Sequence, residues 1–520
     1  MRAPETPLPD WLAYRAANTP DRAALVVGAH TWTYAELNSG ATRTARQLAR
    51  LGVRPGDRVA TLLHNGAAPA LLVHALLRLG ATLVPLNVRL SEDELAWQIR
   101  DSAARALVTE PRTVVLSARA RRENPDLITV SADELGAAIP GGARLDAAPD
   151  SDIELHTAHD PGHVLAIVYT SGTTGQPKGA MLTVSNFWWS AIGSVLNLGT
   201  REDDRWLACM PLFHVGGLSI LLRSAIYGIA AVVHDGFDAD SVNAAIDDQG
   251  ITVVSVVAVM LQRMLDARQD SRYPSSLRCV LLGGGPAPRT LLERCARAGI
   301  PVAQTYGLTE TTSQLCTLAP ADALRRLGAA GRPIYPNELR IAADGHDASP
   351  GEPGEILVRG PVVTAGYAGR ADATARAITD GWLHTGDIGM LDDDGYLYVL
   401  DRRDDLIITG GENVYPAEVE NVLLAHPSII EAGVVGVPDE IWGQRVIAIV
   451  RLADVPGIDG TTIEDELRTH CRARLASYKT PREIHLATGD LPRTASGKLR
   501  RSVLREQILA HGVTRTPGES

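Results

Sequence analysis

The segment HVLAIVYTSGTTGQPKG, residues 163–179, joins a short apolar run to a loop built almost entirely from glycine, serine and threonine. The run 163–169 has the length and the β-branched content of a buried strand. The loop offers glycine amides, hydroxyl groups and one cation, Lys178, which are the parts of a phosphate-binding cradle. We predict that the loop forms a phosphate-binding site at the end of this strand, at the edge of a sheet.

The loop differs from the P-loop that binds phosphates in many nucleotide hydrolases. Lys178 is followed by Gly179, where that motif requires Ser or Thr, and the glycine spacing is different. On composition alone, a flexible surface loop after a buried strand is the simpler interpretation. The phosphate interpretation therefore depends on other segments of the chain.

The chain around this segment alternates helix-like and strand-like periods. Helical periodicity covers residues 34–51 and 67–79, and β-rich runs cover residues 58–63 and 81–86. Farther along, the order strand, glycine turn, helix recurs, with strands at residues 253–259, 278–282 and 302–306. We predict an α/β body whose strand ends gather around one ligand crevice.

The carboxyl-terminal part has a different pattern. Beyond Gly354 the β segments are short, and Asp392 to Gly395 has the Asp-Gly pattern of a hairpin turn. After Arg402 we predict a smaller α+β unit, with helices near residues 416–425 and 462–475 and strands near residues 431–437 and 446–452. The predicted domains are residues 1–401 and 402–520.

Composition and charge exclude several classes of protein. Hydrophobic residues make up 45% of the 520, enough to fill cores in more than one domain. The net charge of −11 is spread along the chain, which argues against a nucleic-acid partner or an anionic membrane surface. We expect neither a membrane span nor a secretion signal, because no apolar run is long enough. Five scattered cysteines without a CxxC pair fit a reducing cytoplasm better than disulfides or zinc: Cys209, Cys279, Cys295, Cys316 and Cys471.

Three further clusters strengthen the phosphate interpretation. Residues 283–286, Gly-Gly-Gly-Pro, let backbone lie against a flat ring. Residues 306–310, Tyr-Gly-Leu-Thr-Glu, supply an aromatic face, a hydroxyl and a carboxylate, and Asp387 ends Thr-Gly-Asp with a carboxylate suited to paired sugar hydroxyls. Each cluster alone is most simply an ordinary turn. Together they would serve the base, phosphates and ribose of a nucleotide.

In this order, the segments resemble the superfamily of acyl-CoA synthetases, luciferases and peptide-synthetase adenylation domains. Residues 491–500, LPRTASGKLR, resemble its catalytic-lysine motif, and residues 401–413, DRRDDLIITGGEN, resemble its hinge and thioesterification segment, with Asp404 at the hinge and Gly410 and Gly411 beside the CoA tunnel. The likeness covers almost the whole chain. It implies an α/β fold: a large AMP-binding domain, with two layered α/β subdomains and a small β-barrel-like subdomain, followed by a small mobile α+β domain.

The resemblance implies an enzyme that uses ATP and Mg²⁺ to activate a carboxylic acid as an acyl-adenylate and then transfers the acyl group to coenzyme A. It assigns the nucleotide phosphates to Thr170, Ser171, Gly172, Thr173, Thr174, Gly175 and Lys178. It assigns the adenine and its surroundings to Gly283, Gly284, Gly285, Gln304, Tyr306 and Gly307, and the ribose hydroxyls to Asp387 and Arg402.

The same resemblance implies the catalytic groups. Lys498 would reach both the α-phosphate and the attacking carboxylate, and Thr309 would contact the α-phosphate. Glu310 and Thr174 would bind Mg²⁺. Taken alone, Lys498 would be interpreted as a mobile tail lysine and Arg402 as part of a surface ion pair.

Two residues bear on the identity of the acid. Amino-acid-adenylating relatives usually carry an Asp at the position of His214, which here resembles the gatekeeper aromatic position of CoA ligases. The likeness is greatest to the branch of ligases that act on 2-succinylbenzoate in menaquinone synthesis. That acid has a second carboxylate, and Arg223 stands where the branch carries a basic residue. Gly283 and Gly307 complete the implied acid site, and the alternative for Arg223 is an exposed position at the helix edge.

One departure from the superfamily leaves the acid open. Ala258 and Val259 replace a polar and rigid pair that is common before the residue at Met260. Another aryl-acid or medium-chain fatty-acid ligase is therefore the nearest alternative.

Rival functions of other classes are weaker. A non-catalytic nucleotide-binding protein could dispense with Lys498 and Glu310, and both are present. A metal-dependent hydrolase could be argued from His156, His159 and His163, but their irregular surroundings predict solvent-exposed loop histidines. The expected partners are small molecules, and the sequence leaves open whether the chain forms a homodimer.

Overall fold

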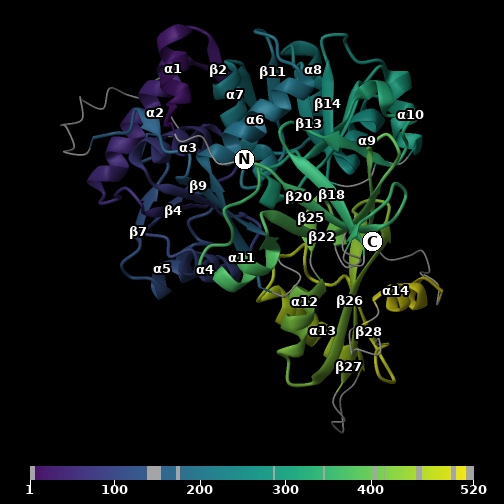
Figure 1. Cartoon of the computed structure of the whole chain (residues 1–520). Coiled ribbons are helices and arrows are strands. Elements are labelled where there is room, and N and C mark those ends of the chain that lie inside the picture. Colours follow the sequence, from purple (N-terminus) through teal and green to yellow (C-terminus); the bar gives the residue numbers. More distant parts are fainter. Residues whose placement is uncertain are drawn as a thin grey trace. The chain divides into compact units, whose positions relative to one another are not determined.

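The structure is a computed structural model that describes residues 6–136, 154–170, 176–284, 287, 289–343, 346–401, 407–414, 416–452, 460–492, 499 and 501–510. The chain divides into two compact units (Figure 1). The first unit comprises Met1–Val88, Leu95–Tyr169 and Gly179–Leu400, and the second comprises Arg89–Glu94, Thr170–Lys178 and Asp401–Ser520. A large α/β part followed by a small α+β part confirms the predicted fold class.

One mainly parallel sheet occupies the amino-terminal part of the first unit. Its strands lie in the order β10 (Lys178–Thr183), β9 (Val164–Thr170), β5 (Thr82–Pro85), β4 (Arg58–Thr61), β6 (Ala106–Thr109) and β7 (Ile128–Ser131). Helices α3 (Ala67–Leu79), α4 (Glu92–Asp101) and α5 (Ala118–Glu123) connect its strands. Helix α3 has the predicted bounds and is almost entirely buried, which explains why its sequence is apolar on every face.

A longer sheet forms the rest of the first unit, and its parallel part carries the segments of interest. Strands β2 (Ala23–Val27), β12 (Ala230–Val233), β11 (Arg205–Ala208), β13 (Val253–Val257), β14 (Cys279–Gly283) and β15 (Val302–Tyr306) are parallel neighbours in this order. The strands predicted at 253–259, 278–282 and 302–306 are confirmed. Their Val- and Leu-rich sequences reflect burial on both faces of the sheet.

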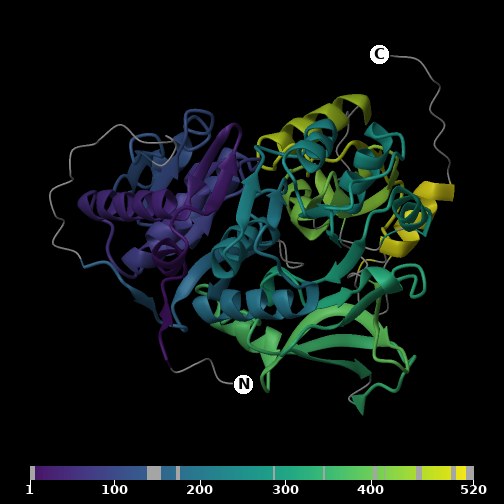
Figure 2. The same cartoon turned by 90° about the horizontal axis from the view of Figure 1, so that it is seen from above.

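Helices flank this parallel part and an antiparallel part continues it (Figure 2). The helices are α1 (Trp11–Asn18), α2 (Tyr34–Arg50), α6 (Val184–Leu198), α7 (Val215–Tyr227), α8 (Ala239–Asp248), α9 (Ala258–Ala267) and α10 (Arg289–Ala298). The antiparallel strands include β16 (Cys316–Leu318), β17 (Ala329–Pro333), β18 (Glu338–Ala343), β20 (Gly354–Arg359), β22 (Trp382–Leu391) and β23 (Leu397–Asp401). The predicted Asp-Gly turn joins β22 to β23: Gly395 has φ +76°, and the Asp392 amide donates to the Tyr396 carbonyl at 3.0 Å.

The second unit has its own sheet and core. Its strands are β24 (Ile407–Thr409), β25 (Glu412–Val414), β26 (Ile429–Asp439), β27 (Gly443–Leu452) and β28 (Glu483–Leu486), and its helices are α12 (Pro416–Leu424), α13 (Gly460–Arg472) and α14 (Arg501–Ala510). The ammonium of Lys479 is buried and lies 2.8 Å from a carboxylate oxygen of Glu418. Among the described residues, no helix has the length and apolar character needed to cross a membrane.

The expectation of solvent-exposed histidines before β9 is wrong for His159. This residue lies in β8 (Ala158–His159), which pairs with β1 (Leu8–Pro9), and it is 3% exposed. Its ring packs edge-on against Trp11, and its Nε2 is 3.9 Å from the Asp10 carboxylate, which also holds Arg78. The pairing of β8 with a strand about 150 residues earlier buries the histidine, and nothing local in the sequence marks that pairing.

Burial of neutral histidines should make the first unit sensitive to acid. Burial lowers the pKa of His74, on α3, to about 4 from an ordinary value of 6.5. As the pH falls from 7 to 5, His74 becomes protonated in the unfolded chain but stays mostly neutral in the folded chain. The free energy of unfolding should therefore fall by roughly 2 kcal/mol from this residue alone. We expect His74→Leu to reduce that fall, as measured by urea unfolding at both pH values. An unchanged pH dependence in the variant would contradict the assignment.

Candidate functional site

The carboxyl ends of four parallel strands meet at one edge of the long sheet. In the register of the sheet, Val257 pairs with Gly283 and Leu282 pairs with Gln304, so β13, β14 and β15 end side by side. Strand β11 ends next to β13 and leads to His214. The structure therefore brings together Gly283, Gly284, Tyr306 and Gly307 at the edge where open α/β sheets bind ligands, and His214 follows the end of the neighbouring strand β11.

A buried hydrogen bond joins two of the predicted nucleotide clusters. The Tyr306 hydroxyl donates to the Asp387 carboxylate at 2.7 Å, and these residues are 2% and 5% exposed. The amide of Asp387 donates in turn to the Thr385 hydroxyl at 3.1 Å. The end of β15 and the middle of β22 thus meet although 81 residues separate them. The Tyr306 hydroxyl orients a carboxylate that is otherwise suited to accept from paired hydroxyls.

Glu310 is held in a fixed position on the short 3₁₀ turn Thr309–Thr311. Its carboxylate accepts from the Tyr367 hydroxyl at 2.9 Å, and its carbonyl accepts from the Thr364 amide at 2.8 Å. Reasoning from the sequence missed Tyr367. It lies 57 residues from Glu310 and belongs to no motif that the sequence marked.

The segment that holds Glu310 lies beside the strand that follows the predicted phosphate loop. In β10, the Met181 amide donates to the Gly366 carbonyl at 2.8 Å, and the Gly179 carbonyl accepts from the Ala368 amide at 2.8 Å. Lys178 directly precedes Gly179. Thr170 and Lys178 flank the loop and belong to the second unit, with the Thr170 hydroxyl 3.5 Å from the Lys178 carbonyl.

Several predicted residues lie outside the described part of the chain. These are Ser171, Gly172, Thr173, Thr174 and Gly175 of the loop, with Gly285, Arg402, Asp404 and Lys498. Gly410 and Gly411 are described in the second unit, and both have positive φ, at +58° and +84°. A Cβ on Gly410 would lie 2.8 Å from the Trp442 ring, so that turn admits no side chain.

Close packing explains Gly307 and Gly284. A Cβ on Gly307 would lie 1.6 Å from the carbonyl oxygen of Ser313, and a Cβ on Gly284, where φ is +83°, would lie 2.8 Å from Val257. The turn that approaches Gly307 is itself constrained, because Thr312 and Ser313 have φ +51° and +87°. Backbone therefore lines this edge of the sheet where side chains would otherwise fill the space. Gln304, on β15, is 6% exposed, and its Nε2 has no hydrogen-bond partner among the described residues.

Arg223 is buried within the first unit on α7, and not exposed at a helix edge. It is 2% exposed, its Nη2 donates to the Ser190 hydroxyl at 2.9 Å, and its guanidinium lies 5.7 Å from the Trp206 ring centre. Within the described ranges its Nε has no hydrogen-bond partner. Burial lowers the pKa of Arg223. A buried cation with an unused donor is costly unless an anion completes its environment.

His214 stands at the start of the same helix. It is the residue before Val215 at the amino terminus of α7, and its carbonyl accepts from the Leu218 amide at 2.9 Å. Its ring lies 4.7 Å from that of Phe213. Helix α7 therefore links the strand-end position of His214 to the buried position of Arg223.

The carboxylates of the site bear on which metal it could hold. Among the described residues, no group of three or more His, Cys, Asp and Glu side chains is placed to hold a metal ion. Mg²⁺ in phosphoryl-transfer sites commonly takes one or two carboxylates and completes its shell with phosphate oxygens and water. The single fixed carboxylate of Glu310 fits that kind of binding.

Comparison with known families matches two models to this chain. Residues 12–368 match the family of AMP-binding enzymes, and residues 418–498 match the AMP-binding enzyme C-terminal domain. A 2-succinylbenzoate–CoA ligase from Geobacillus sp. (strain WCH70) is 48% identical over 510 residues, which cover 97% of this chain and 98% of the relative.

Solved structures of o-succinylbenzoate CoA synthetase from Bacillus subtilis are similar over nearly the whole length. A double mutant bound to the product analogue OSB-NCoA matches with a TM-score of 0.89 and 43% identity, covering 96% of this chain and 99% of that one. The complex with the acyl-adenylate OSB-AMP matches with a TM-score of 0.73 and 43% identity, covering 99% and 100%. The complex with ATP and magnesium ion matches with a TM-score of 0.73 and 43% identity, covering 97% and 100%.

The tight contact at Gly307 gives a test of the site's rigidity. We expect Gly307→Ala to displace the turn at residues 309–313, to lower the free energy of unfolding by about 2 kcal/mol and to weaken AMP binding. Chemical denaturation and calorimetric titration with AMP measure the two effects. The matched control is Gly236→Ala, because a Cβ on Gly236 meets nothing within 4 Å. Equal behaviour of the two variants would show that the close approach has no energetic consequence.

Proposed function

The chain belongs to the family of AMP-binding enzymes, and on that premise we propose that it activates 2-succinylbenzoate with ATP and transfers the acyl group to coenzyme A. The observation that carries the proposal is the 48% identity, over 97% of the chain, to a ligase named for that substrate. The geometry of the first unit agrees, because hydrogen bonds hold the Asp387 carboxylate on Tyr306, at the end of β15, and the Glu310 carboxylate on Tyr367.

In the first half-reaction a substrate carboxylate oxygen bonds to the α-phosphorus of ATP, and the bond from that phosphorus to the pyrophosphate oxygen breaks. Two anions approach one another, so charge on the phosphorus oxygens must be neutralised as it builds. Mg²⁺ would supply part of that neutralisation, with Glu310 as its protein carboxylate. Tyr367 contributes by keeping the Glu310 carboxylate in one orientation. On the family resemblance, Thr309 and Lys498 contact the α-phosphate.

In the second half-reaction the thiol sulfur of coenzyme A bonds to the acyl carbon, and AMP leaves with the electrons of the anhydride bond. The thiol proton passes to solvent, and AMP leaves as the phosphate anion. On the family resemblance we assign Asp404 to the hinge that permits the change of step, and Gly410 and Gly411 to the thiol tunnel. The two glycines have positive φ angles, a backbone conformation that glycine adopts at little cost.

Nucleotide recognition follows from the fixed carboxylate of Asp387. One of its oxygens accepts from Tyr306, which orients the group toward hydroxyl donors of a ribose. The close-packed glycines at 284 and 307 let backbone lie against the adenine and its sugar. Gly283 and Gln304, at the ends of β14 and β15, line the same edge.

The acid site is proposed to include His214 at its mouth and Arg223 in its interior. The buried guanidinium keeps a donor, Nε, that no described residue satisfies. A second carboxylate on the substrate would accept from it and remove the cost of an uncompensated buried cation. An acid with one carboxylate would leave that cost in place.

We propose that the enzyme is cytoplasmic, in keeping with its five free and buried cysteines.

The activity is tested by ATP–pyrophosphate exchange with a panel of acids. Exchange should depend on 2-succinylbenzoate and be weak with benzoate, octanoate and an amino acid. Glu310→Gln should lower the exchange rate on the order of a hundredfold, because the carboxylate charge is lost while the shape is kept. Exchange supported by octanoate and not by 2-succinylbenzoate would show that the proposed substrate is wrong and that the proposed reaction type is right. No exchange with any acid would refute the proposal.

The role of Arg223 predicts a specific loss of discrimination. Wild-type enzyme should favour 2-succinylbenzoate over the monoester that masks its ring carboxylate, and Arg223→Met should reduce that preference by about tenfold or more. The KM values of both acids, measured for each enzyme, give the result. The control is Tyr227→Phe, one helical turn further along α7. If Arg223→Met keeps the full preference, the second carboxylate binds elsewhere.

A further inference from the structure

The loop after β4 carries an asparagine that reaches across to the second sheet. The Asn65 Nδ2 donates to the carbonyl oxygens of Met210 at 2.9 Å and His234 at 3.0 Å, while its Oδ1 accepts from the Leu212 amide at 2.9 Å. Met210 and Leu212 lie in the loop after β11, and His234 directly follows β12. One side chain from the first sheet therefore satisfies three backbone groups in two loops of the other.

The chemistry of these contacts requires an amide. The side chain must donate two hydrogens and accept one, which matches the capacity of Asn and of no other side chain of that length. An Asp in the same place could still accept from Leu212. Its carboxylate would then face two carbonyl oxygens with no hydrogen between them, which is unfavourable.

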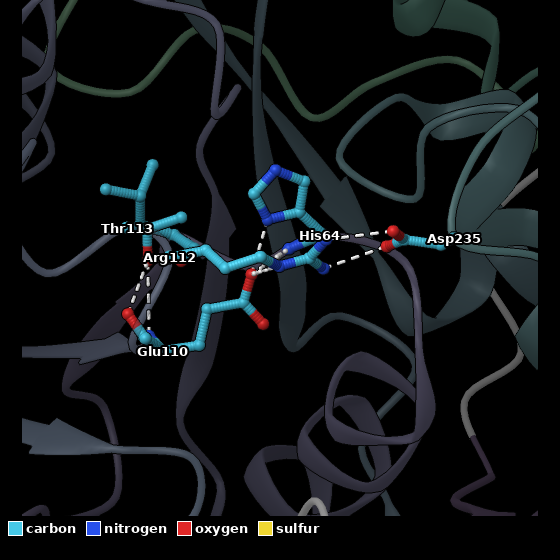
Figure 3. A network of polar contacts seen from close by, with 6 residues as sticks. His64, Glu110, Arg112, Thr113 and Asp235 are labelled. Atoms are coloured by element: carbon cyan, nitrogen blue, oxygen red, sulfur yellow. Dashed lines mark hydrogen bonds and ion pairs between the residues drawn. The ribbon is translucent and has the colours of Figure 1, made fainter.

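Polar contacts join the loop that carries Asn65 to the loop after β6 (Figure 3). His64 approaches the Glu110 carboxylate through its ring Nδ1, and its amide donates to the same carboxylate at 3.2 Å. In the next turn, the Thr113 hydroxyl donates to the Leu62 carbonyl at 2.6 Å. The loop after β4 is thereby fastened to the loop after β6.

A charged contact makes a second bridge between the same two sheets. Arg112, in the loop after β6, forms a bidentate pair with Asp235, in the loop after β12, with both distances 2.8 Å (Figure 3). The pair is largely exposed, so it contributes little energy by itself. Together with Asn65 it limits how far the loops after β11 and β12 can move from the first sheet.

The loop that Asn65 holds leads directly into the acid side of the proposed site. The His214 amide donates to the Pro211 carbonyl at 3.3 Å, and a Cβ on Gly217 would lie 2.3 Å from that carbonyl oxygen. The loop is thus packed tightly on the first turn of α7, which carries Arg223 two turns farther on. A displacement of Met210 or Leu212 should therefore also displace His214, because the turn between them is hydrogen-bonded and closely packed against α7.

We infer that Asn65 is a positioning residue for acid recognition, acting through residues 210–214 and the start of α7. Its hydrogen bonds within the described part of the chain go to Met210, Leu212 and His234. The inference deepens the proposed function and rests on it for the identity of the acid. It predicts that loss of the Asn65 amide raises the KM for the acid and leaves the KM for ATP nearly unchanged.

The test compares Asn65→Ala and Asn65→Asp with wild type in ATP–pyrophosphate exchange. Both variants should raise the KM for 2-succinylbenzoate about tenfold, equivalent to about 1.4 kcal/mol, with the KM for ATP within about twofold of wild type. Asn65→Asp keeps the size of the side chain, so a matching rise in both variants assigns the effect to the hydrogen bonds and not to packing.

A matched control separates positioning from general stability. Asn243 also bonds backbone across two elements, donating to the Met264 carbonyl at 2.9 Å and accepting from the Tyr273 hydroxyl at 2.7 Å, between α8 and α9. Asn243→Ala should lower the thermal midpoint without changing either KM. If it raises the KM for the acid as much as Asn65→Ala does, the effect is general and the inference fails.

Failure of the positioning role of Asn65 and failure of the proposed substrate give different results. Unchanged KM values in both Asn65 variants, an equal rise for acid and ATP, wild-type behaviour of Asn65→Asp, or failure of both variants to fold would overturn the positioning role. If wild type shows exchange only with another acid, the proposed substrate fails. The same comparison is then made with that acid, and the KM split retains its meaning.

Discussion

The parallel register of β11, β13, β14 and β15 is the constraint on which the candidate site depends. Pairing of Val257 with Gly283 and of Leu282 with Gln304 forces three chain segments to leave the sheet at one edge. Because each strand is buried on both faces, a slip in register would expose apolar residues or bury polar loop residues. The positions of the glycines at 283, 284 and 307, at or directly after the ends of β14 and β15, follow from this register.

Electrostatics divides that edge into two parts. On the nucleotide part the side chains of Asp387 and Glu310 are carboxylates, and each accepts from a tyrosine hydroxyl. On the acid part the charge has the opposite sign: the Arg223 guanidinium is buried against Ser190 and Trp206 without a carboxylate from the described residues. An acid with two carboxylates can use both parts, one carboxylate reacting at phosphorus and the other neutralising the buried cation.

Local sequence patterns were enough to predict the elements but not their contacts. Helix α3 was predicted with its observed bounds, and the strand ending at Tyr306 was also predicted, because apolar period and flanking glycines are local signals. The Tyr367 hydroxyl on Glu310, the Asn65 amide on three backbone groups and the burial of His159 were not predictable in that way. Each of these contacts joins segments 57 or more residues apart. The local sequence around a single Tyr, Asn or His does not indicate which distant residue it will contact.

The two parts of the site are also stabilised by different kinds of contact. Around Gly307 part of the stabilisation is local: the Leu308 amide donates to the Thr311 hydroxyl at 2.8 Å, and Thr312 and Ser313 adopt left-handed φ angles. The Thr312 carbonyl also accepts from the Ser190 hydroxyl at 2.6 Å. The loop at 210–214 instead takes two hydrogen bonds from Asn65, a side chain in the loop after β4. A turn fixed by local bonds keeps its geometry when a remote residue changes, whereas a loop held across two sheets shifts with either of them. Loss of the Asn65 amide therefore acts first on the acid part, whereas the carboxylates of the nucleotide part depend on partners of their own, Tyr306 and Tyr367.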